Sequence, residues 1–187
     1  LTNNNDALLP LQRAATRPAG RLPIIFLDVD GVLNFVGTSE AEGLEKVPLR
    51  HLALLLRRTG ARVVLSSTWR IHQRLRDKLQ QALWLEGVDV RESDATPVLN
   101  WDTWGQERGD EAIKLRCREI RGYLLDNRVV PETFSSWVVL DDLPLSSVDD
   151  LFGPHNFVCT DPAVGLTLRD IAVAAQILQG MKASHEY

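Results

Sequence analysis

Short, continuous apolar runs recur along the chain and predict strands that are buried on both faces. The clearest are Ile24–Leu27, Ala61–Leu65 and Trp137–Leu140, each followed by small polar or acidic residues. Weaker runs at Val88–Val90 and Asn156–Val158 bring the expected number of strands to about five. Uninterrupted apolar runs are typical of parallel strands that helices cover on both faces of a sheet.

Between these runs, apolar residues recur at the three- and four-residue spacing of amphipathic helices. The four stripes are Leu49, Leu52, Leu55 and Leu56; Ile71, Leu75, Leu79 and Leu83; Ile113, Cys117, Ile120 and Leu124; and Leu168, Ile171, Ala175 and Leu178. Pro48 suits a first helical position, and Gly60 and Gly87 follow the ends of two stripes. The alternation predicts an α/β, three-layer Rossmann-like fold with a central, mostly parallel five-stranded sheet.

Length and composition favour one domain. The chain has 187 residues, of which 44% are hydrophobic, enough for one well-buried core. Residues 1–22 show no sustained period and contain Asn, Pro and Gly, so we expect a mobile arm there and a single folded domain over residues 23–187.

Charge and cysteine content exclude several classes of protein. The formal net charge of -4 argues against a global basic field of the kind that binds nucleic acid without sequence preference. Cys117 and Cys159 belong to no Cys-x-x-Cys pair, which argues against a disulfide framework or a structural zinc site.

No apolar run approaches the roughly 18 residues of a membrane span, so we expect a soluble, intracellular, cytoplasmic protein.

Polar residues follow three of the predicted strands. In a parallel sheet they gather at one edge: Asp28 and Asp30, Ser66 and Ser67, and Asp141 and Asp142. Clustered carboxylates raise one another's pKa unless a hard cation lies among them, and their oxygens are the ligands that Mg²⁺ prefers. The sequence therefore predicts a Mg²⁺ site. A phosphate bound beside it needs a serine and a cationic side chain, for which Lys114, Arg116 and Arg108 are candidates.

These segments resemble a known superfamily. Asp28-Val29-Asp30-Gly31, a serine after the second strand, a later Lys or Arg and a late acidic pair resemble, in order, the motifs of the haloacid dehalogenase-like hydrolases. Further segments resemble the branch named for the haloacid dehalogenase domain of Swiss Army Knife RNA repair proteins: Leu65-Ser66-Ser67-Thr68-Trp69-Arg70, Thr96-Pro97, Arg116-x-x-Glu119-Ile120, Val139-Leu140-Asp141-Asp142 and Gly165-Leu166-Thr167. The resemblance covers roughly residues 23–180.

The resemblance implies phosphomonoester hydrolysis through an aspartyl-phosphate. Asp28 is expected to attack phosphorus, and Asp30 to protonate the leaving oxygen and then deprotonate the attacking water. Ser66 is expected to bind the phosphoryl oxygens, with assistance from Ser67. The family pattern assigns Mg²⁺ to the Asp28 carboxylate, the Asp30 backbone carbonyl and Asp142, with Asp141 as a second ligand or an outer-shell partner.

Several candidates for the cationic residue lie close together in the sequence. A helix starting at Gly109-Asp110 rises about 1.5 Å per residue, which carries Arg118 and Arg121 too far from the catalytic edge. Arg116 lies on the flank of the apolar stripe, and the family pattern selects it as well. We expect Arg116 to act, with Lys114 as the reserve candidate.

The spacing of the motifs bears on the substrate. Gly31–Ala61 is mostly consumed by a loop and a helix, so we expect a minimal or absent cap domain and an open site suited to bulky phosphates. Trp101 and Trp104 are candidate stacking residues for a base, although packing within their own loop competes with this interpretation. The RNA-repair branch favours a nucleotide or an RNA or DNA end as the phosphorylated substrate; the net charge lends no support.

Other interpretations compete with these. A phospho-accepting signalling domain also combines a parallel sheet with an acidic pair, but there the pair follows the first strand; an inactive haloacid dehalogenase-like binding domain is the other alternative. For Ser66 and Ser67, helix capping competes with phosphate binding. Trp69 is expected to be structural, and Arg70 to lie on a solvated helix face.

Overall fold

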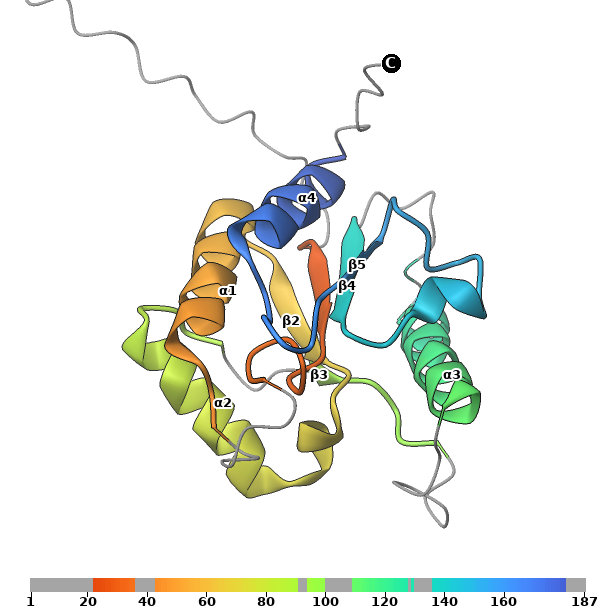
Figure 1. The fold of residues 1–187 in the computed structure, drawn as a ribbon, viewed down its shortest axis with the longest axis horizontal. Helices are drawn as coiled ribbons and strands as arrows, with labels where there is room; N and C mark the ends of the chain where they lie inside the picture. Colours follow the sequence, from red (N-terminus) through yellow and green to blue (C-terminus); the bar gives the residue numbers. More distant parts are fainter. Residues whose placement is uncertain are drawn as a thin grey trace, which may run out of the picture.

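All the strands described lie in one parallel sheet. A computed structural model describes residues 22–35, 43–90, 94–99, 109–127, 129 and 136–180. The strands are β1 (Ile24–Leu27), β2 (Arg62–Leu65), β3 (Asp94–Ala95), β4 (Trp137–Asp141) and β5 (Phe157–Cys159). Their order is β3-β2-β1-β4-β5 and every pairing is parallel, so β1 lies at the centre (Figure 1).

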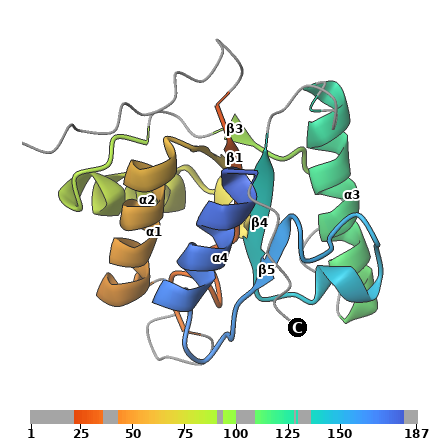
Figure 2. The same cartoon turned by 90° about the horizontal axis from the view of Figure 1, so that it is seen from above.

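Four α-helices of the described ranges cover the two faces of the sheet. They are α1 (Lys46–Thr59), α2 (Gln73–Leu85), α3 (Asp110–Asp126) and α4 (Leu168–Leu178), joined by the short 3-10 helices η1 (Thr68–Ile71) and η4 (Leu145–Ser147). Helices α1, α2 and α4 lie on one side of the sheet and α3 on the other (Figure 2). Each side has its own buried core, because successive strand residues point to opposite faces. The predicted three-layer Rossmann-like fold is confirmed.

Some of the predicted boundaries and burials are wrong. Val88–Val90 is not a strand: its valines pack against the core, but the ladder with β2 is made by Asp94–Ala95. Pro48 is the third residue of α1, and Ile71 ends η1 before α2 begins. Leu168, the first residue of α4, is 60% exposed because it lies beyond the core that the rest of its stripe reaches.

Residues 1–21 of the predicted arm lie outside the described residues. Over the ranges that the structure does describe, no helix combines the length and the apolar character that crossing a membrane requires.

The register of the sheet positions the polar strand ends. Leu27 pairs with Leu65 on one side and with Leu140 on the other. The ladder continues for one more step, since Asp28 N donates to Leu140 O at 2.9 Å and Ser66 N donates to Leu27 O at 2.9 Å. Consequently the residues after these three leucines emerge side by side at the carboxyl edge of the sheet.

Candidate active site

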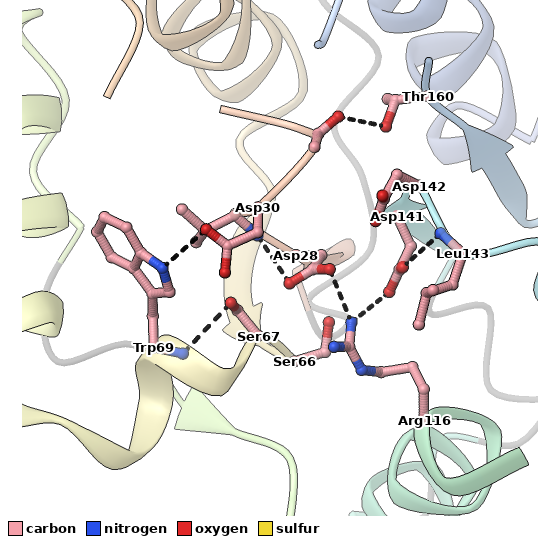
Figure 3. A network of polar contacts seen from close by, with 12 residues as sticks. Asp28, Asp30, Ser66, Ser67, Trp69, Arg116, Asp141, Asp142, Leu143 and Thr160 are labelled. Carbon is pink, nitrogen blue, oxygen red and sulfur yellow. Dashed lines mark hydrogen bonds and ion pairs between the residues drawn. The ribbon is translucent and has the colours of Figure 1, made fainter. Parts of the chain in front are cut away.

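A buried arginine lies between two strand-end carboxylates. Arg116, in the second turn of α3, places Nη1 3.2 Å from Asp28 Oδ2 and also donates to Asp141 Oδ2 (Figure 3). All three residues are at least 92% buried. Burial by itself would lower the pKa of Arg116, but Asp141 and Asp28 outweigh it and hold the pKa above its ordinary value. Arg116 therefore stays charged and fixes both carboxylates.

Three carboxylates converge beside this arginine. Asp28, Asp141 and Asp142 each offer an oxygen, and these oxygens lie within 4.8 Å of one another. Burial, with help from the Asp28 charge, raises the pKa of Asp142 to about 6. Burial also raises the pKa of Asp141, against the opposing effect of Arg116. Carboxylates held this close are stabilised by a cation, and an all-oxygen donor set fits a hard divalent ion such as Mg²⁺.

The charge balance supports the same fit. When all three carboxylates are ionised, the Arg116 guanidinium leaves two negative charges in the cluster, which is the charge that a divalent cation neutralises. The turn at Gly31 lies close against this cluster: a Cβ there would come within 2.6 Å of the Asp142 carboxylate, and the φ of +74° favours glycine. The residues present thus fit a divalent metal.

The Asp30 side chain lies apart from these three carboxylates. Its Oδ1 accepts a hydrogen bond from Asn34 Nδ2 at 2.8 Å and another from Trp69 Nε1 at 3.2 Å. Burial raises the pKa of Asp30 above its ordinary value, and the Asp28 charge adds to the shift, although the two donors oppose it. A carboxyl with a raised pKa is suited to acid–base chemistry.

The two serines after β2 have different environments. Both are fully buried. Ser67 Oγ accepts from Trp69 N at 3.3 Å as the N-cap of η1, so the capping interpretation is confirmed for this residue. Ser66 Oγ has no hydrogen-bond partner among the residues that the structure describes. Because buried hydroxyls are normally paired, Ser66 presents an uncommitted donor at the edge that carries Asp28.

Arg70 is not on a solvated helix face; that prediction is wrong. Its Nη1 donates to Ser66 O at 2.9 Å and to Ser67 O at 2.8 Å, and its Nη2 lies 2.6 Å from Glu119 Oε1. The exposed fractions of the Arg70 and Glu119 side chains are 2% and 4%. Glu119 is one turn beyond Arg116 on α3, so this buried ion pair joins the serine loop to the helix that carries Arg116.

Of the remaining sequence-predicted residues the structure describes only Lys114, and it is not brought into this cluster. Lys114 is exposed and pairs with Glu111 at 2.8 Å, because its position on α3 points it to solvent while Arg116 points to the sheet edge. The structure thus places Arg116, and not the reserve candidate Lys114, beside the carboxylates. Arg108, Trp101 and Trp104 lie outside the described residues.

Several contacts at the site involve residues that the sequence reasoning missed or treated as structural. Asn34 and Trp69 hold Asp30, Thr160 Oγ1 donates to Gly31 O at 3.0 Å, and the Leu143 N–H donates to Asp141 Oδ1 at 3.0 Å. For Asn34 a sequence signal exists, because it is a polar residue four positions after Asp30, at the end of the turn that follows β1. Thr160 comes from the end of β5 and carries no comparable signal.

Fold and site together define the class: an α/β domain of the haloacid dehalogenase type, with its carboxylates at the carboxyl edge of a parallel sheet. Residues 24–171 match the family model described as the HAD domain in Swiss Army Knife RNA repair proteins, and the chain belongs to this family. The family membership supports hydrolase chemistry on a phosphorylated substrate and confirms the resemblance described from the motifs. No curated protein and no solved structure matches the chain.

Proposed function

We propose that this domain is a Mg²⁺-dependent phosphomonoesterase that works through an aspartyl-phosphate at Asp28. One observation carries the proposal: Asp28 is held by Arg116 beside the carboxylates Asp141 and Asp142, next to the Ser66 hydroxyl, which no hydrogen bond engages within the described ranges. This arrangement combines a nucleophile, a cationic side chain, a set of metal ligands and a hydroxyl that can donate a hydrogen bond to the phosphate. It is what transfer of a phosphoryl group to a carboxylate needs.

The proposed reaction has two steps. An Asp28 carboxylate oxygen attacks phosphorus and the bond to the leaving oxygen breaks, while Asp30 gives that oxygen a proton. Asp30 then takes a proton from the water that attacks the aspartyl-phosphate, which releases phosphate and restores Asp28. Ser66 Oγ binds a phosphoryl oxygen, and Arg116 offsets the negative charge that develops near Asp28.

The proposed metal ligands are the carboxylates of Asp28, Asp142 and Asp141, together with the Asp30 backbone carbonyl. Bound there, Mg²⁺ supplies positive charge that lets the nucleophile and the phosphate approach each other. The convergence of three carboxylate oxygens supports this assignment.

For the substrate we propose a nucleotide or a phosphorylated RNA or DNA end. The description of the matching family, as a domain of RNA repair proteins, supports this class. The structure also describes only a turn and α1 between β1 and β2 over residues 28–35 and 43–61, with no separate cap domain in those ranges. A site without a cap suits a phosphate on a large molecule better than a small metabolite that needs enclosure.

Phosphate release from an aryl phosphate tests the enzymatic assignment. With Mg²⁺ present, Asp28→Asn is expected to lower kcat/KM on the order of 10⁴-fold, because the nucleophile is lost. Asp77→Asn is the matched control: the same change on the exposed face of α2 is expected to leave turnover unaltered. Chelation should abolish release and added Mg²⁺ should restore it. Full activity of Asp28→Asn would contradict the proposal.

A substrate panel tests the proposed substrate class. Nucleotides and 3′- or 5′-phosphorylated RNA and DNA ends are compared with sugar phosphates and phosphopeptides at equal concentration. We expect the highest kcat/KM for a nucleotide or nucleic-acid end. A clear preference for sugar phosphates would contradict the substrate class while leaving the phosphatase assignment intact.

A further inference from the structure

The two carboxylate oxygens of Asp30 lie in different environments. Oδ1 accepts hydrogen bonds from Asn34 Nδ2 at 2.8 Å and from Trp69 Nε1 at 3.2 Å. Within the described parts of the chain, no hydrogen bond reaches Oδ2. In Figure 3 the Trp69 indole lies on one side of Asp30, and Asp28 with Arg116 lies on the other. The carboxyl group is therefore held from the side away from the nucleophile.

Both donors are themselves fixed. Trp69 is 2% exposed and packs in the core on the α1–α2–α4 side of the sheet, and its backbone N–H donates to Ser67 Oγ. Asn34 is 4% exposed, and its Oδ1 accepts from Gly31 N at 3.0 Å. Because a backbone N–H can only donate, this contact determines the orientation of the Asn34 amide and turns its NH₂ group toward Asp30.

The hydrogen bonds to Oδ1 determine which oxygen of Asp30 can carry a proton. An oxygen that accepts two N–H hydrogen bonds has both lone pairs engaged, so a proton on this carboxyl belongs on the other oxygen. An indole N–H cannot accept a hydrogen bond, and the amide NH₂ cannot either. A rotation that exchanged the two oxygens of the protonated carboxyl would therefore point its O–H at two donors, so the proton stays on the oxygen away from Asn34 and Trp69.

We propose that Asn34 and Trp69 are positioning residues that hold Asp30 by Oδ1 and reserve Oδ2 for proton exchange with the leaving oxygen and then with water. This inference rests on the proposed phosphatase function. Asp30 is the group that touches the reacting atoms; Asn34 and Trp69 act only through it. The competing interpretation is that Trp69 serves the core alone, as its burial would also allow.

Leaving-group dependence separates the two interpretations. A nitrophenolate departs readily without a proton, whereas an alkoxide is too basic to depart unless the general acid protonates it. Loss of the Asp30 orientation should therefore harm alkyl phosphates far more than aryl phosphates. General disorder of the core should harm both equally. The ratio kcat/KM is the right quantity, because it contains only the steps up to departure of the leaving group and excludes hydrolysis of the aspartyl-phosphate.

The test uses Trp69→Phe in the full chain, with nitrophenyl phosphate and a phenylethyl phosphate as the two substrates. Phenylalanine keeps an apolar ring but loses the N–H donor. We expect kcat/KM to fall on the order of 10-fold for the alkyl substrate and less than about 3-fold for the aryl substrate, since one of two donors is removed and general acid catalysis is typically worth about 10² to 10⁴. Trp84→Phe, the same change at a residue that is 64% exposed on α2, should leave both values unchanged.

A second variant keeps the test decisive if Trp69→Phe does not fold. Asn34→Ser removes the other donor and should show the same preference for the aryl substrate. Equal losses for the two substrates, in whichever variants fold, would overturn the positioning role and leave the phosphatase proposal standing. Aryl phosphate turnover that survives Asp28→Asn would instead overturn the proposed function itself.

Discussion

Removal of Glu119 should destabilise the fold far more than removal of an exposed ion-pair partner. The Arg70–Glu119 pair is 2.6 Å long, and the exposed fractions of its side chains are only 2% and 4%. Burial is the main cause that raises the pKa of Glu119 and also the main cause that lowers the pKa of Arg70. Each buried charge is thus unfavourable by itself and depends on its partner, so a single substitution leaves the other charge buried and unpaired.

The magnitude follows from what each substitution removes. Glu119→Gln keeps an oxygen that can accept from Leu99 N (3.2 Å in the native chain) and from Arg70 but removes the charge, so it should cost about 1 to 3 kcal/mol. Glu119→Leu removes the acceptor as well and should cost about 3 to 5 kcal/mol. The double variant Arg70→Met/Glu119→Leu leaves neither charge buried without its partner. Its loss of unfolding free energy should therefore be at least about 1 kcal/mol smaller than the summed losses of the two single variants.

Urea denaturation at pH 7, followed by circular dichroism, measures these differences in the free energy of unfolding. Arg50→Gln is the control, because the Arg50–Glu86 pair is 3.4 Å long and the Arg50 side chain is 64% exposed. Its effect should stay below about 0.5 kcal/mol. The reasoning is refuted if Glu119→Leu shifts the unfolding free energy no more than Arg50→Gln does, or if the two single variants at the buried pair are strictly additive.

Two further pairs of variants test the serine loop and the glycine turn. Ser66→Ala should change the free energy of unfolding by less than about 0.5 kcal/mol, because its hydroxyl has no partner among the described residues. The same variant should lower phosphatase kcat/KM roughly 100-fold. Ser67→Ala should instead lower the free energy of unfolding by about 1 kcal/mol, because it removes the cap of η1. The reverse pattern would show that Ser67, not Ser66, binds phosphate. Gly31→Ala and Gly60→Ala should each lose about 1 kcal/mol from their positive φ, but only Gly31→Ala should also weaken Mg²⁺ activation, since only there does the new Cβ meet Asp142. Equal Mg²⁺ titrations of activity for both glycine variants would contradict this.

Much of the site was accessible from the sequence because its members follow apolar strands directly. Once a strand is buried in a parallel sheet, the residue after it must emerge at the carboxyl edge, and this places Asp28, Ser66 and Asp141 together. The rise along the predicted helix also separated Arg116 from Arg118 and Arg121, since only the first turns of α3 lie near that edge.

The structure decided the features that depend on contacts between distant segments. The strand at Asp94–Ala95 has no hydrophobic pattern of its own, and it exists because its backbone reaches β2. The sequence does not distinguish Arg70 from an exposed arginine, because its partners, Glu119 and the carbonyl oxygens after β2, come from distant or adjoining segments that only the fold brings around it.

The sequence by itself therefore determined the order of the elements and the chemical groups at the edge of the sheet, because both are encoded in local periodicity and in the residues that end each strand. Only the tertiary structure decided which of these groups are paired, which of the two serine hydroxyls caps a helix, and how the Asp30 carboxyl is oriented. The physical reason is that burial and hydrogen bonding depend on neighbours brought together by the whole fold, and no short stretch of sequence contains them.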